Sequence, residues 1–177
     1  MKKLFLLGSI LCILLSSSCK AGDSQKNVTV SGFMLNTYVS ITLYGTDNEE
    51  LAKQALDICN EHEQLFSRTI PDSALSRLNN TKEAVDADES LYELIQTGIY
   101  YSDLTEGALD ITIEPFISLW DISGTAPQVP DTQQIKALLP FVNYKHIQLT
   151  EENHTITLHN NASIDLGAIA KGYIADK

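Results

Sequence analysis

An α+β fold is predicted from this sequence by three observations. Residues 38–44 and 146–159 alternate polar and apolar side chains, as half-buried strands do. Residues 51–66 and 91–99 instead carry apolar side chains three and four positions apart, as amphipathic helices do. These segments follow one another without a regular strand–helix alternation, which favours α+β over a parallel α/β fold. The chain carries no internal repeat and no low-complexity tract.

The N-terminal residues 1–18 have the features of a secretory signal peptide. Lys2 and Lys3 precede an apolar run that is shorter than the about 20 residues of a membrane-spanning helix, and small residues lead to Cys19. We expect Cys19 to be a lipidation site, which predicts an exported protein anchored to the bacterial inner membrane and facing the periplasm, or anchored at the cell surface. The alternative is simple cleavage near Ala21, which releases a soluble secreted protein.

The composition narrows the class of partner. A formal net charge of −11 argues against nucleic acid and against an anionic membrane surface, and favours a cation or a ligand carried by a metal ion. Cys12 lies in the segment that export removes and Cys19 would be lipidated, so Cys59 is left without an intramolecular partner. The mature fold therefore depends on its hydrophobic core.

The mature chain is divided into a polar tether, residues 19–27, and a folded part, residues 28–177. In the folded part, one or two strands are expected to end at Gly45. A helix should follow from a D-x-x-E capping box that begins at Asp47, and it should run to Phe66. Its predicted apolar face comprises Leu51, Ala55, Ile58, Cys59, His62, Leu65 and Phe66. For His62 we favour a hydrogen-bonded histidine of the core over a metal ligand, because no second ligand lies one helical turn away.

The remaining elements follow from turn and capping residues. Pro71 to Ser73 predict a turn before a short helix, and a second D-x-x-E box beginning at Asp86 starts a helix that ends near Gly107. A third helix extends from Asp131, with Gln134 completing the capping box, to Pro140. A hairpin spans residues 146–159. A strand ending at Ile164 and a helix starting near Gly167 complete the chain.

The segment Asp165–Tyr173, "DLGAIAKGY", is the first candidate site. Gly167 allows close approach of a ligand, free amides at a helix start favour an anion, and Lys171 one turn further in can face a phosphate. Asp165 is placed to bind a ring N–H, a hydroxyl or a metal ion. Small residues at a tight helix–sheet contact would give the same pattern, so a packing role stays open here.

The segment "EGALDIT" is the second candidate. Asp110 interrupts what is otherwise an apolar strand, and a buried carboxylate needs hydrogen-bond donors. These donors come either from a structural turn or from a ligand hydroxyl.

Four segments taken together resemble the ApbE family of FAD:protein FMN transferases. They are "LNTYVSITLYG", "LFSRTIPDSALSRLN", "EGALDITIEPFISLW" and "IDLGAIAKGYIAD", and they occur in the order in which the family has them. The resemblance covers most of the mature chain. It implies an ApbE-type, T-fold-like flavin transferase domain of which this chain is the N-terminal portion, incomplete at the C-terminus.

The resemblance also implies chemistry. Such enzymes are exported lipoproteins that use Mg²⁺ to transfer FMN from FAD to a Thr or Ser hydroxyl of a target protein through a phosphoester bond. The acceptor would be a subunit of a membrane redox pump. Matching the motifs position by position places Leu35, Thr69, Ala108, Leu109, Asp110, Asp165 and Lys171 around FAD. It assigns catalytic roles to Asp165 and Lys171, and gives the metal the main-chain carbonyl of Ala168.

The sequence departs from the family pattern at three points. Thr69 stands where the family often has a tyrosine, and Leu35 and Asn36 stand where it usually has Met and Gly. Family members are nearly twice as long, so we expect the 177-residue chain taken alone to be inactive. Two other functions therefore stay open beside FMN transfer: Mg²⁺-dependent FAD hydrolysis to FMN and AMP, and flavin binding by a lipoprotein without catalysis.

Overall fold

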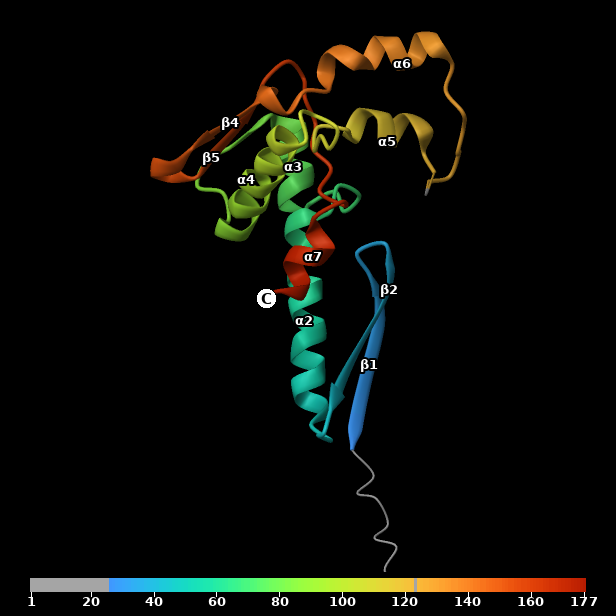
Figure 1. Cartoon of the computed structure of the whole chain (residues 1–177), viewed down its shortest axis with the longest axis vertical. Coiled ribbons are helices and arrows are strands. Elements are labelled where there is room, and N and C mark those ends of the chain that lie inside the picture. The colour runs from blue at the N-terminus through green and yellow to red at the C-terminus, as the bar shows by residue number, and fades with distance from the viewer. Residues whose placement is uncertain (1–25, 123) are drawn as a thin grey trace, which may run out of the picture.

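The predicted α+β class is confirmed by a computed structural model, which describes residues 26–122 and 124–177. Figure 1 shows a stalk, in which a β-hairpin lies beside one long helix, and a head that holds most of the shorter helices and a second sheet. The predicted signal peptide, Cys19 and nearly all of the predicted tether lie outside the described residues. None of the helices in the described part is long and apolar enough to cross a bilayer.

The stalk hairpin consists of β1 (Asn27–Met34) and β2 (Thr37–Tyr44), paired antiparallel so that Met34 lies opposite Thr37. The two turn residues, Leu35 and Asn36, both adopt left-handed backbone angles, with φ of 53° and 54°. Two consecutive left-handed residues are typical of the tight turn whose twist matches a β-hairpin. Two strands ending before Gly45 therefore confirm the sequence prediction.

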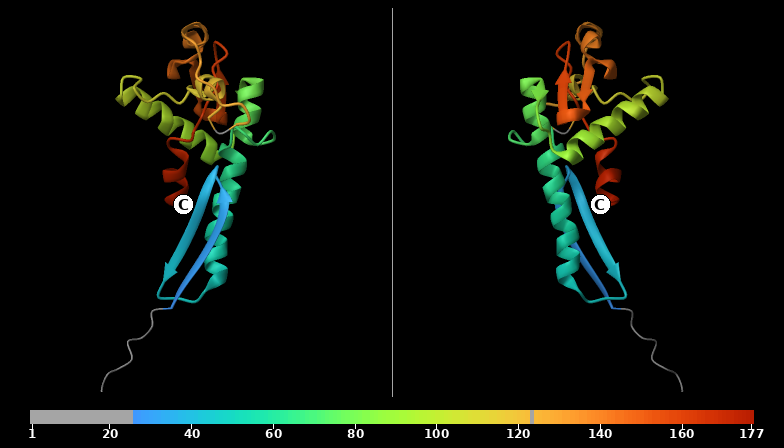
Figure 2. Two further views of the ribbon diagram at one scale, coloured as in Figure 1. Left: turned by 90° about the vertical axis from the view of Figure 1, so that its right-hand side faces the viewer. Right: turned by 90° about the vertical axis from the view of Figure 1, so that its left-hand side faces the viewer.

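The long helix α2 (Glu49–Phe66) packs along the hairpin, and Figure 2 shows the two elements side by side in both views. Ala52, Cys59 and Phe66 are its buried residues. Two details of the prediction are wrong. The N-cap is Asn48 and not Asp47, because the Asn48 side chain accepts the amide of Leu51. Leu51 is 49% exposed, because it lies in the first helical turn at the far end of the stalk, away from the core.

The head begins with α3 (Ala74–Thr81), the two-residue strand β3 (Glu83–Ala84) and α4 (Glu89–Leu104). The predicted turn before α3 is confirmed, with Ser73 as N-cap. Helix α4 is capped by Asp88, two residues after the predicted start. The reason is that the backbone amide of Asp86 donates to Asn153, which keeps this segment beside the neighbouring sheet until residue 87.

The rest of the head follows in chain order. It comprises α5 (Glu114–Trp120), α6 (Thr132–Leu138), the 3₁₀ turns η2 (Leu139–Phe141) and η3 (Tyr144–His146), β4 (Ile147–Thr150), η4 (Glu151–Asn153) and β5 (Thr155–Leu158). The sheet order is β3-β5-β4, with both pairs antiparallel. The predicted capping box of Asp131 with Gln134 and the predicted hairpin across residues 146–159 are both confirmed.

The C-terminal segment returns from the head to the stalk and ends in α7 (Ala170–Ala175) beside α2. The prediction of a strand end at Ile164 is wrong. The side-chain amide of Asn79 pairs with the Ile164 backbone, donating to its carbonyl at 2.8 Å and accepting from its amide at 2.7 Å. A side chain thus replaces a neighbouring strand. The final helix starts at Ala170, later than the predicted start near Gly167, because residues 167–169 form a turn.

One hydrophobic core joins α2, α3, α4, the second sheet and the C-terminal segment. Its fully buried large side chains include Leu75, Leu78, Leu91, Leu94, Ile95, Ile111, Ile156, Ile164 and Leu166. Because Ile164 and Leu166 are anchored in this core, the polar residue between them, Asp165, has a fixed position at its edge.

Candidate functional site

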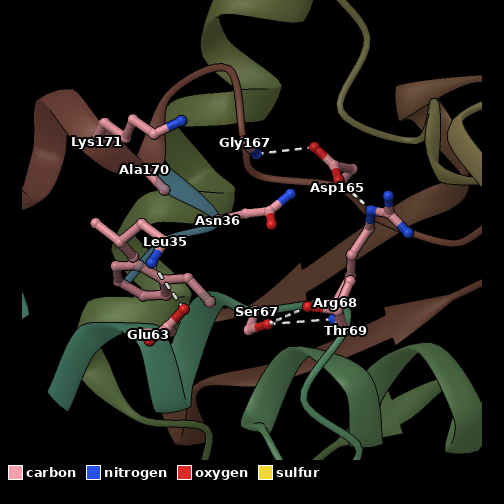
Figure 3. Close-up of a pocket in the computed structure, with 11 residues that line it drawn as sticks. Leu35, Asn36, Glu63, Ser67, Arg68, Thr69, Asp165, Gly167, Ala170 and Lys171 are labelled. Carbon is pink, nitrogen blue, oxygen red and sulfur yellow. Dashed lines mark hydrogen bonds and ion pairs between the residues drawn. The ribbon is translucent and has the colours of Figure 1, made fainter. Parts of the chain in front are cut away.

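A cleft lies where the hairpin tip, the end of α2 and the C-terminal segment meet, and Figure 3 shows the side chains that line it. These are Leu35, Asn36, Glu63, Phe66, Ser67, Arg68, Thr69, Asp165, Gly167, Ala170 and Lys171. The enclosed volume is about 210 Å³. Ligand pockets commonly measure about 300–1,000 Å³, so the cleft is too small to enclose a dinucleotide completely.

The hairpin tip is tied to α2 at this cleft. The backbone amide of Leu35 donates to the Glu63 carboxylate over 2.7 Å. This contact satisfies an amide that the two-residue turn leaves without a strand partner. It also brings Leu35, which the resemblance places at the flavin, to the cleft wall.

Asp165 is held on both carboxylate oxygens. Oδ1 accepts the amide of Gly167 at 2.8 Å, and Oδ2 forms an ion pair with Nε of Arg68 at 2.8 Å. Both side chains are mostly buried, with exposed fractions of 16% for Asp165 and 21% for Arg68. A carboxylate oxygen has two acceptor positions, so each still has capacity for one ligand donor.

The loop after α2 is fixed by Ser67. Its Oγ accepts the amides of Thr69 and Ile70, each at 3.1 Å. Its carbonyl accepts the hydroxyls of Ser73 and Ser76. This network holds Arg68 and Thr69 in place although they belong to no helix or strand. Thr69 lines the cleft with an exposed side chain, so the tyrosine that the family resemblance led us to expect at this position is replaced by a small hydroxyl side chain.

Lys171 lies in the first turn of α7, with an exposed side chain that lines the cleft. The prediction that it lies one turn inside the helix is wrong, because the helix begins later than expected. The predicted free amides are also partly wrong. Gly167 donates to Asp165, and Ile169 and Ala170 both donate to the Leu166 carbonyl. Lys171 therefore carries the attraction for an anion at this end of the segment.

The second candidate segment does not line the cleft. Asp110 lies in a turn and not in a strand, because its Oδ1 accepts the amide and hydroxyl of Thr112 at 2.8 and 2.6 Å. Its Oδ2 accepts the amide of Tyr144 at 2.9 Å. These contacts favour the structural role that the sequence left open. Ala108 is exposed and Leu109 packs on the core.

The two candidate segments are nevertheless adjacent. The amide of Asp165 donates to the carbonyl of Ile111 at 2.8 Å, which joins the Asp110 turn to the cleft. Asp110 also lines a separate hollow with Asp103, Gly107 and Tyr144. A ligand longer than the cleft could therefore continue from Asp165 toward Ala108 and Asp110.

The described residues alone do not fit a Mg²⁺ ion. Among them no group of three His, Cys, Asp or Glu side chains is close enough to hold a metal. Ala168 is exposed, and its carbonyl accepts no backbone hydrogen bond from the rest of the described chain. That oxygen is a suitable donor, but Mg²⁺ requires six oxygen ligands in a near-octahedral arrangement.

Sequence reasoning missed two charged residues of the cleft, Glu63 and Arg68. Glu63 lies on the predicted helix one turn before Phe66, and Arg68 is a charged residue within the half-buried segment that follows. Their positions were visible in the sequence. Their partners, Leu35 and Asp165, are distant in the chain and become apparent only in the fold.

The fold resembles that of solved ApbE proteins. The ApbE protein from Thermotoga maritima superimposes with a TM-score of 0.79 at 28% identity, over 85% of this chain and 50% of that one. A flavin transferase ApbE from Vibrio cholerae shares the fold, with a TM-score of 0.74, 24% identity and coverage of 86% and 52%. The chain thus has an α+β fold of the kind that these ApbE proteins share.

Sequence comparison gives the family. Residues 35–177 match the ApbE family, to which the chain therefore belongs. A FAD:protein FMN transferase of Treponema pallidum is 27% identical in an alignment 184 positions long, which covers 97% of this chain and 51% of that protein. One from Klebsiella pneumoniae is 29% identical over 150 residues, covering 83% and 47%. The chain spans about half the length of the curated relatives that it matches.

Proposed function

We propose that the full-length protein transfers FMN from FAD to a Thr or Ser hydroxyl of a target protein in a Mg²⁺-dependent reaction. The observation that supports it most is the composition of the cleft. Three of the four family-like segments converge there, through Leu35, Thr69 with Arg68, and Asp165 with Lys171. The fourth, which carries Asp110, is joined to it by one backbone hydrogen bond. Relatives that align with 83% and 97% of this chain are FAD:protein FMN transferases.

The proposed reaction breaks one bond of the FAD pyrophosphate. The hydroxyl oxygen of the acceptor attacks the phosphorus atom of the FMN half, AMP leaves, and the hydroxyl proton is released. Negative charge on the phosphoryl oxygens limits such a reaction, so a nearby cation stabilises the transition state. Lys171 supplies a positive charge at the cleft. Asp165, held by Gly167 and Arg68, accepts a donor from the nucleotide and fixes its orientation.

In this proposal Mg²⁺ binds together with FAD. When bound, Mg²⁺ would supply positive charge that offsets the charge of the phosphates. The Ala168 carbonyl is the donor that we assign to it in the described chain. The proposal predicts that removing divalent cations with a chelator abolishes transfer.

The test uses the full-length protein with FAD, Mg²⁺ and a candidate acceptor, and measures flavin fluorescence of the acceptor in a denaturing gel. We expect a fluorescent acceptor with the wild type and at least about 100-fold less with Lys171→Ala, as for loss of a group that stabilises the transition state. Lys136→Ala is the matched control, because Lys136 is exposed on α6 and does not line the cleft. An unlabelled acceptor with the wild type counts against transfer.

One alternative function has a specific observation in its favour. The second candidate is FAD hydrolysis to FMN and AMP. It is favoured by Thr69, which provides no aromatic ring at the cleft. Product analysis without any acceptor separates the two activities, since hydrolysis gives free FMN and transfer gives none. Stable FAD binding with neither product would instead indicate a flavin-binding lipoprotein without catalysis.

The location and acceptor are part of the same proposal. We place the protein on the bacterial inner membrane facing the periplasm, or at the cell surface, with a lipid on Cys19. The acceptor we propose is a subunit of a membrane redox pump. Globomycin-sensitive processing would support lipidation, and an N-terminal peptide whose mass shows no lipid would contradict it.

A further inference from the structure

Arg68 is a mostly buried cation of the cleft that uses only one of its hydrogen-bond donors within the described chain. Its Nε pairs with Asp165 Oδ2 at 2.8 Å. Neither Nη atom has a hydrogen bond or ion pair with residues 26–122 or 124–177. A guanidinium carries five N–H donors in one plane, so most of its donors are available to a ligand. Figure 3 shows the group at the cleft wall beside Asp165.

The surroundings of Arg68 restrict its movement. The preceding residue, Ser67, is held by hydrogen bonds from the amides of Thr69 and Ile70 and from the hydroxyl of Ser76. The Arg68 side chain is 21% exposed, and its partner Asp165 is fixed by Gly167. An arginine held by both its backbone and a carboxylate loses little further freedom when it binds a ligand.

The charges of the cleft indicate the class of ligand. Lys171 and Arg68 are its cations, and Asp165 and Glu63 are its anions. Each anion already has a partner, Asp165 in Arg68 and Glu63 in the Leu35 amide. In a protein with a net charge of −11, an anionic ligand needs local cations to overcome the overall repulsion. A planar guanidinium matches the oxygen geometry of phosphate.

We propose that Arg68 is a substrate-binding residue that donates from its Nη atoms to a phosphate oxygen of the dinucleotide, while Asp165 orients it through Nε. Together with Lys171 it forms a pair of cations on two walls of the cleft, one on the loop after α2 and one on α7. The inference rests on the proposed function and adds to it the residue that recognises the phosphates. It also gives Asp165 a second role, as the positioning residue for Arg68.

The test measures dissociation constants of the full-length protein for FAD, ADP and riboflavin by isothermal titration calorimetry. ADP carries the pyrophosphate without the flavin, and riboflavin carries the flavin without phosphate. For Arg68→Gln we expect FAD and ADP to bind about tenfold or more weakly, as for a lost hydrogen bond to a charged group, while riboflavin binding stays within about twofold. Arg77→Gln is the matched control, because Arg77 is exposed on α3 and does not line the cleft.

A second variant covers the case in which Arg68→Gln disturbs the fold. Arg68→Lys keeps the positive charge but lacks the planar guanidinium group, so it should retain more FAD affinity than Arg68→Gln. Equal losses in the two variants would overturn the proposal. So would an equal loss for riboflavin and ADP, because the effect would then arise from the displacement of Asp165.

The outcomes also separate this proposal from the proposed function. If the wild type binds FAD and Arg68→Gln binds it equally well, the role of Arg68 fails and FMN transfer is unaffected. If the wild type binds none of the three ligands, both fail. If Arg68→Gln weakens FAD and ADP selectively but no acceptor is labelled, the phosphate role stands and FMN transfer fails.

Discussion

Asp165 and Lys171 line the same cleft, but the chain holds them differently. Asp165 has an exposed side-chain fraction of 16% and contacts Arg68 and Gly167, whereas Lys171 is exposed. We therefore expect a substitution at Asp165 to affect both folding and ligand binding, and one at Lys171 to affect ligand binding alone.

Asp165→Asn should lower the free energy of unfolding by about 1–3 kcal/mol, because Arg68 loses its charged partner in a mostly buried position. Lys171→Ala should change it by no more than about 0.5 kcal/mol, as for an exposed side chain. Urea denaturation of both variants measures the difference. Equal stabilities for Asp165→Asn and the wild type would show that the ion pair does not stabilise the fold.

Asn36 provides a second test at this scale. It has a left-handed φ of 54° and an exposed side chain at the hairpin tip. Glycine adopts this backbone without strain, so Asn36→Gly should raise the free energy of unfolding by about 0.5 kcal/mol. The same substitution at Asn60, exposed within α2, should lower it by a similar amount, because glycine is unfavourable in a helix. If both substitutions changed the free energy of unfolding in the same direction, the left-handed turn at Asn36 would be contradicted.

At the scale of the elements, periodicity predicted those helices and hairpins whose backbone N–H and C=O groups hydrogen-bond to one another. The two hairpins and the helices α2, α4 and α6 do so, and the sequence located each of them within a few residues. The segments around Asp110 and Ile164 have the same apolar alternation but form no strand. Their backbone groups bond to side chains, of Asp110 in one case and Asn79 in the other. Neither kind of replacement, local at Asp110 or between distant segments at Ile164, leaves a periodic pattern in the sequence.

Packing between α4 and the Asp110 turn depends on Gly98. A Cβ atom at this position would lie 2.7 and 2.9 Å from two side-chain atoms of Ile111. Gly98→Ala should therefore lower the free energy of unfolding by about 1–3 kcal/mol through overpacking. Gly172→Ala in α7, where a Cβ meets nothing within 4 Å, should raise it by about 0.5–1 kcal/mol. Thermal unfolding of the two variants measures this difference. Unfolding temperatures that change in the same direction in both would contradict it.

Helix α7 is linked to α4 by a hydrogen bond to a carboxyl group, Glu93, whose pKa is shifted. The Tyr173 hydroxyl donates to Glu93 at 2.6 Å, and this hydrogen bond, followed by the charge of Lys177, lowers the pKa of Glu93 below its ordinary 4.5. A carboxyl with a lowered folded-state pKa stabilises the fold above its unfolded pKa, and this contribution disappears as the pH falls through the folded-state value.

Tyr173→Phe should therefore reduce the free energy of unfolding most near about pH 7, and the difference from the wild type should shrink below about pH 4.5. Denaturation at both pH values measures it. A difference that is independent of pH would place the effect in the ring contacts with His62 and Phe66. His62 itself bonds the Ile58 carbonyl at 2.8 Å, as expected for a core histidine.

For the whole molecule, sequence motifs identified lining residues on each element around the cleft, and the contacts in the fold added Arg68 and Glu63. Asp165 and Lys171 could be predicted because a lysine and a carboxylate flank glycines at a turn, a local pattern. Arg68 and Glu63 could not, because their importance comes from partners on other elements. The resemblance placed Ala108 to Asp110 at FAD, and this stays a prediction, since these residues lie beside the cleft and not in it.

The central claim is that FAD binds in the cleft between the hairpin tip, Arg68 and α7. A crystal structure of the full-length protein with FAD tests it most directly. We predict electron density for the dinucleotide that contacts Leu35 and Asp165, has phosphate oxygens near Lys171 and Arg68, and extends toward Ala108 to Asp110. Density confined to the hollow beside Asp103 and Tyr144, with the cleft empty, would contradict the account.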